Sequence, residues 1–92
     1  MTREEVLVLV KSWAVGDCPM LVLFDAMDEA QIDMTALIRV MEHTTETHAW
    51  LNFVRMVNRR VYCGGSGLHD ELAADVRIAL YESLSNAILE GA

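Results

Sequence analysis

The chain lacks the features of a secreted or membrane-spanning protein. Its 92 residues include one proline and two cysteines, and Cys18 and Cys63 are too far apart for a CxxC motif. Such sparse cysteine is typical of reduced thiols in a cytoplasmic protein, not of a disulfide framework. The longest apolar runs have five residues, against about 20 needed to span a bilayer. No secretory signal pattern opens the chain, so we expect a cytoplasmic protein without a membrane segment.

Positive charge is also scarce. Fourteen acidic residues against seven basic ones give a net charge of −7, which disfavours binding to nucleic acid or to anionic membranes. The charge is unevenly distributed: residues 17–46 contain seven acids and one base, whereas residues 47–65 contain three arginines and no acid. One basic segment therefore lies in an otherwise acidic chain.

Apolar residues, by contrast, are abundant. They make up 53% of the chain, which predicts a folded domain and excludes general disorder. Two runs, residues 6–10 (VLVLV) and 20–24 (MLVLF), are apolar on every side of a helix and need cover on more than one face. Because a domain of this size buries only a modest fraction of its surface, a second copy of the chain is the expected source of that cover.

Helix signals recur along the chain. The expected helices are residues 3–15, 17–30, 34–43 and 45–62, and a long final helix within 72–88 that follows a glycine-rich turn at 64–67. The expected N-caps of these five helices, in chain order, are Thr2, Asp17, Asp33, Thr44 or Thr45, and Ser66. Thr2 is expected to form a capping box with Glu5, and Asp17 is followed by Pro19, an early-helix proline. Gly16 is expected to end the first helix. These signals predict one all-α domain over residues 1–92, a compact bundle of four to five short helices.

Apolar residues at helical spacing define the expected core. They are Val6, Leu9, Val10, Trp13, Leu37, Ile38, Met41, Trp50, Phe53, Val54, Val57, Val61, Leu72, Val76, Ala79, Leu80, Leu84, Ala87 and Ile88. Met20, Met27, Met34 and Met41 repeat every seven residues, which fits either a seam for a partner or core positions of separate helices. We favour the core, because residues 31–33 interrupt the helical pattern.

A β-hairpin is the alternative for the two apolar runs, because VLVLV alternates β-branched residues. Helix is favoured, since residues 11–13 follow without a turn signal and Trp13 continues the apolar stripe.

The basic segment has three interpretations. Arg55 and Arg59 share a helix face, and Arg60 lies about 100° further round. These arginines form a solvated helix face, pair with acidic helices of this chain or of a second copy, or bind an anion.

Catalytic and metal-binding patterns are weak. His43 and His48 are five residues apart, so their side chains diverge by about 140° on one helix. Cys63 with His69 is the one nucleophile–base pair worth naming, and no third group orients it. The GGSG segment is followed by Asp70 and Glu71, which would repel a phosphate. We expect no enzyme activity, metal or cofactor.

Three functions fit these observations. The favoured one is a protein-interaction module that acts by stoichiometric binding and forms a homodimer. The expected self-association residues are Val6, Val8, Leu9, Val10 and Trp13, and the expected acidic partner-binding residues are Asp25, Asp28, Glu29, Asp33 and Glu42. The second is an acidic inhibitor, of the kind carried by phages and mobile elements, that blocks the nucleic-acid site of a basic target. The third is a small anionic-ligand binder that uses Arg55, Arg59 and Arg60.

Overall fold

The described part of the chain is built from helices. The computed structural model describes residues 1–63 and 72–90. The helices in these residues are α1 (Arg3–Ala14), α2 (Met20–Glu29), α3 (Met34–Thr44), α4 (Thr47–Cys63) and α5 (Ala74–Leu89). No strand occurs in the two described segments. The predicted all-α bundle is therefore confirmed, and both apolar runs are helical instead of forming a hairpin. The glycine-rich turn predicted at 64–67 lies outside the described residues.

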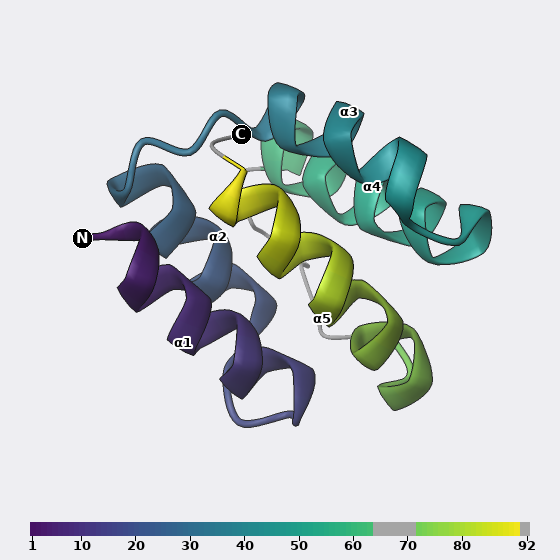
Figure 1. The fold of residues 1–92 in the computed structure, drawn as a ribbon, viewed down its shortest axis with the longest axis horizontal. Helices are drawn as coiled ribbons and strands as arrows, with labels where there is room; N and C mark the ends of the chain where they lie inside the picture. Colours follow the sequence, from purple (N-terminus) through teal and green to yellow (C-terminus); the bar gives the residue numbers. More distant parts are fainter. Residues whose placement is uncertain (64–71, 91–92) are drawn as a thin grey trace.

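The central element is α5. It packs against α1, α3 and α4, and Figure 1 shows it, in green and yellow, between the α1–α2 pair and the α3–α4 pair. α1 and α5 run antiparallel. At one end the Arg3 guanidinium donates a hydrogen bond to the carbonyl oxygen of Ile88 at 2.7 Å. At the other end Arg77 of α5 lies beside Gly16, which follows α1.

The predicted core is largely confirmed. Side chains that are less than 2% exposed include Val6, Val10, Trp13, Leu37, Met41, Phe53, Leu80, Leu84 and Ile88. Phe24 of α2 meets Phe53 of α4 edge to face, with ring centroids 6.0 Å apart. Ala79 was expected in the core but is exposed, because it lies off the stripe that Leu80 and Leu84 present to the neighbouring helices. The side chain of Val61 lies outside the described part.

Two of the predicted N-caps are confirmed. Thr2 and Glu5 form the predicted capping box, and the Asp33 carboxylate accepts from the backbone N–H groups of Thr35 and Ala36. The predicted cap at Asp17 is wrong, because α2 begins after Pro19, which makes no side-chain hydrogen bond. The N-cap of α5 is Ala73, also without a side-chain hydrogen bond, and the predicted cap Ser66 lies outside the described residues.

The predicted threonine cap of α4 is replaced by Glu46. The Glu46 carboxylate accepts from the backbone N–H groups of His48 at 2.9 Å and Ala49 at 3.0 Å. Thr44 and Thr45 are instead the last residue and the C-cap of α3. The carboxylate satisfies two N–H groups at once and lies at the positive end of the helix dipole.

The Glu46 cap makes the start of α4 sensitive to pH. Hydrogen bonds from the backbone of His48 and Ala49 lower the pKa of Glu46 below its ordinary value of 4.5. Since the folded-state pKa is the lower one, the cap stabilises the fold fully above about pH 4.5 and this contribution is lost as the pH falls through the lowered value. We expect Glu46→Gln to reduce the melting temperature more at about pH 7 than at about pH 3, because the cap's contribution shrinks as the pH falls toward the lowered pKa.

Circular dichroism melting at the two pH values measures this difference. Glu42→Gln, at an exposed glutamate of α3, is the matched control and should change the melting temperature little at either pH. An equal reduction by Glu46→Gln at both pH values would show that the carboxylate charge plays no part in the cap.

The connection between α2 and α3 separates the methionine series. Gln31 has a positive φ of 60°, and its N–H and that of Ile32 donate to the carbonyl oxygens of Asp28 and Met27, the hydrogen bonds of a Schellman motif. The methionines therefore belong to two helices. Met20, Met27 and Met41 are buried and Met34 is half-buried, as expected of core residues.

The first apolar run is covered mostly by its own chain. Val6, Val10 and Trp13 are in the core and Leu9 is half-buried, whereas Val8 is 66% exposed. Of the residues predicted for self-association, Val6, Val10 and Trp13 are therefore enclosed by the other helices. The second run behaves similarly, with Leu21 and Val22 left partly exposed.

Candidate interaction surface

The outer face of α1 and its C-cap residue carry two strongly exposed apolar side chains. Val8, Lys11 and Val15 are three and four residues apart and therefore share one helical face. Val8 and Val15 are each 66% exposed. Since α1 packs against α2 on one side and α5 on the other, this face is bordered by two grooves.

The α1–α2 groove is formed by two neighbouring hollows of about 310 and 460 Å³ that share Met1 and Leu9. The residues that line it are Met1, Glu5, Val8, Leu9, Val22, Asp25, Ala26 and Glu29. Its floor is apolar, and the charged side chains that line it are Glu5, Asp25 and Glu29. Asp25 also contacts Arg60, so Glu5 and Glu29 are the carboxylates that remain at the edge. An apolar segment with positive charges along its edge is the complementary ligand.

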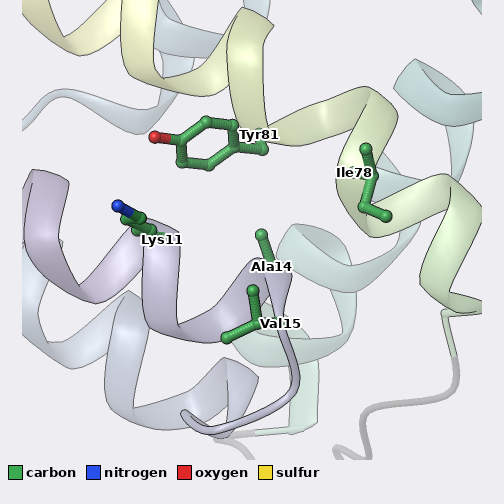
Figure 2. Close-up of a pocket in the computed structure, with 5 residues that line it drawn as sticks. All are labelled: Lys11, Ala14, Val15, Ile78 and Tyr81. Carbon is green, nitrogen blue, oxygen red and sulfur yellow. The ribbon is translucent and has the colours of Figure 1, made fainter.

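The α1–α5 groove is smaller and has a different character. It has a volume of about 180 Å³ and is lined by Lys11, Ala14, Val15, Ile78 and Tyr81. Figure 2 shows the Lys11 amine and the Tyr81 hydroxyl at one end of the groove, with Val15 and Ile78 toward the other. Its lining therefore combines aliphatic side chains with a single cation.

Arg60 joins α4 to the acidic helix α2. Its guanidinium contacts the carboxylates of Asp25 at 2.7 Å and Asp28 at 2.5 Å, and lies over the ring of Phe24 at 5.9 Å from the centroid. Burial alone would lower the pKa of Arg60, but the hydrogen bonds and charges of the two aspartates raise it. Internal pairing, one of the three interpretations of the basic segment, is therefore confirmed for Arg60.

The predicted anion patch is consequently divided. Arg60 is turned toward α2, while Arg55 is exposed and Arg59 is half-buried on α4. The three guanidinium groups do not form one open cationic surface, because Arg60 already has two carboxylate partners.

The predicted acidic face is divided as well. Asp25 and Asp28 contact Arg60, and Asp33 caps α3. Glu29 and Glu42 are exposed, and Glu29 lines the α1–α2 groove together with Asp25. Of the five acidic residues, the structure therefore brings two to an apolar groove.

The histidines and cysteines form no site among the described residues. Cys18 is buried in the core, and His43 and His48 are exposed on α3 and α4. The side chain of Cys63 and the whole of His69 lie outside the described part. No group of three or more potential ligands for a metal ion occurs in the residues described, and none of these helices is long and apolar enough to cross a membrane.

Sequence reasoning missed two residues of α5 that line the α1–α5 groove, Ile78 and Tyr81. Ile78 is 63% exposed, and its only signal in the sequence is that it lies off the apolar stripe of that helix. Val15 was expected to lie at the end of the first helix, without a role. The groove between them depends on the contact of helices that are far apart in the sequence.

Comparisons with protein families, curated proteins and solved structures gave no match to this chain, so a functional inference depends on these surfaces alone.

Proposed function

We propose that this protein is a protein-binding module whose α1–α2 groove binds a basic amphipathic segment of another protein. The observation that carries this proposal is an apolar floor surrounded by acidic side chains. Val8 and Val22, at 66% and 47% exposed, offer aliphatic contact area, while Glu5 and Glu29 lie at the edge. The proposed activity is stoichiometric binding.

The segment that we propose for this groove is an amphipathic helix. An amphipathic helix buries side chains at positions i, i+3 and i+4 in an apolar groove and leaves its polar edge to the rim. Lysine or arginine at that edge would face Glu5 and Glu29. The net charge of −7 would also attract a basic partner from a distance and speed its association.

A second copy of the chain is a poor occupant of this groove. In a symmetric dimer through the groove, the acidic rims of the two copies would face each other, and like charges across an interface disfavour association. Three of the five residues in the predicted self-association seam, Val6, Val10 and Trp13, are also less than 2% exposed. The partner proposed for this groove is therefore a different protein.

The inhibitor of a nucleic-acid-binding protein has less support. Imitation of a phosphate backbone needs carboxylates that stay open to the target, but Asp25 and Asp28 contact Arg60 and Asp33 caps α3. The anionic-ligand binder has less support too, because Arg60 is engaged with α2.

A synthetic peptide tests the proposed function. The probe is a peptide of about 18 residues that contains only leucine and lysine, with the leucines at helical spacing. Titration calorimetry should show one peptide per chain. Affinity should fall about tenfold or more in Val8→Lys or Val22→Lys, because each substitution replaces an apolar side chain of the groove with a positive charge that repels the lysines of the peptide. The affinity of the wild-type chain should also fall with added salt.

Leu51→Lys is the matched control. Leu51 is 48% exposed on α4, outside the groove, so the substitution makes the same change in net charge without altering the floor. Equal losses in Leu51→Lys and Val8→Lys would overturn the proposal, as would equally tight binding of a peptide with glutamate in place of lysine. Circular dichroism confirms that each variant is folded.

A further inference from the structure

A second apolar patch lies across the α1–α5 groove. Val15, the C-cap residue of α1, is 66% exposed, and Ile78 of the antiparallel helix α5 is 63% exposed. The groove between them has a volume of about 180 Å³, against about 300–1,000 Å³ for a typical small-molecule site. It therefore suits one or two side chains of another protein better than a free ligand.

The charges on this patch are of opposite sign. Lys11 lines the groove on the α1 side. Glu82 is exposed on the α5 side, and it shares a helical face with Ile78, four residues before it. Neither charge has an ion-pair partner among the residues that the structure describes.

We propose that the α1–α5 face binds a second copy of this chain in a two-fold symmetric dimer. A two-fold axis parallel to the helices places α1 of each copy over α5 of the other. Val15 then packs on Ile78 of the second copy, and Lys11 lies opposite Glu82 of the second copy. The same two contacts occur twice, as a two-fold interface requires.

Charge distinguishes this face from the α1–α2 groove. The acidic rim of the α1–α2 groove repels a copy of itself, whereas the α1–α5 face is self-complementary, with one cation on α1 and one anion on α5. The apolar contact is small, so we expect a dissociation constant of roughly micromolar or weaker. The proposed dimer interface therefore differs from the one predicted from the first apolar run. It uses side chains that are exposed in the fold, in place of the buried Val6, Val10 and Trp13.

Two single substitutions test the symmetric pairing. Lys11→Glu places two glutamates opposite each other at each contact, and Glu82→Lys places two lysines there. Sedimentation equilibrium should show a dimer for the wild-type chain and a dissociation constant raised about tenfold or more for either variant alone. An equimolar mixture of the two variants should form a heterodimer with nearly wild-type affinity. In that heterodimer the introduced glutamate of one chain faces the introduced lysine of the other, and the remaining contact is the original pair of Lys11 and Glu82.

Each of the other outcomes overturns the proposal. A wild-type chain that stays monomeric at about 0.5 mM has no such interface. A dimer that both variants leave unchanged uses another surface, and a mixture that fails to reassociate excludes the two-fold pairing. Both substitutions are at exposed positions, so the variants should fold normally. Lys11→Glu should also bind the leucine–lysine peptide at least as tightly as the wild type, because it adds negative charge outside the α1–α2 groove. This keeps the test separate from that of the α1–α2 groove.

Discussion

Replacing Phe53 by alanine is expected to lower the free energy of unfolding by about 3–5 kcal/mol. Phe53 is fully buried and meets Phe24 edge to face at 6.0 Å, so the truncation removes a ring from the contact between α4 and α2. A chain of this length has a total stability of roughly 5–14 kcal/mol. The substitution therefore consumes a large part of the stability, and the melting temperature should fall by about 15 °C or more.

Urea and thermal unfolding followed by circular dichroism measure this effect. Leu51→Ala removes a large apolar side chain from the same helix at a position that is 48% exposed, and it should cost about 0.5 kcal/mol or less. Phe53→Leu should fall between the two, because it leaves a smaller cavity. Comparable losses for Phe53→Ala and Leu51→Ala would show that α4 does not pack as described.

The role of Phe53 could be predicted because it depends on spacing within one helix. Apolar residues three and four apart must share a face, and the most apolar face of a helix is turned toward the core. The same reasoning correctly placed Leu80, Leu84 and Ile88. It failed for Ala79, because alanine has too small a side chain for periodicity to decide between the core and the edge of the stripe.

The caps and ion pairs could be predicted only in part. Asp33 was identified because it caps its own helix. Glu46 was missed because preference ranks threonine above glutamate at an N-cap, while the structure uses Thr44 and Thr45 to end α3. The Arg60 contacts join residues more than 30 positions apart, and such a pairing depends on how α4 crosses α2. Sequence spacing carries no information about that crossing.

The two grooves illustrate the same limit for function. Composition indicated that the apolar runs need cover on more than one face, but the assignment of each α1 side chain to the core or the surface required the neighbouring helices. With α2 and α5 in place, Val6 and Val10 are enclosed while Val8 and Val15 stay exposed. The resulting surfaces differ in charge: Glu5, Asp25 and Glu29 line the α1–α2 groove, whereas Lys11 lines the α1–α5 groove. The two proposals use this difference to assign a different protein to the first groove and a second copy to the second.

Gly16→Val is expected to destabilise the fold by about 1–3 kcal/mol. Gly16 has a φ of 90°, and its N–H donates to the carbonyl oxygen of Trp13 while that of Asp17 donates to Ser12. A Cβ at this position would lie 3.6 Å from Nη2 of Arg77, an ordinary contact, so Gly16→Ala should cost only the backbone strain. Valine adds branched carbons at an angle that β-branched residues rarely adopt, so its loss should be larger.

Gln31→Gly is the matched experiment at the end of α2. Gln31 follows the C-cap residue of α2, as Gly16 follows that of α1, and it has a φ of 60°. Glycine at position 31 therefore removes backbone strain, whereas valine at position 16 introduces it. The relief of about 1–2 kcal/mol is partly offset by the greater freedom of glycine in the unfolded chain, which leaves an expected gain of up to about 1 kcal/mol. Thermal unfolding should therefore shift in opposite directions for Gly16→Val and Gln31→Gly. Losses in both variants would mean that the left-handed backbone at Gln31 is not strained, and that side-chain contacts of Gln31 stabilise this end of α2.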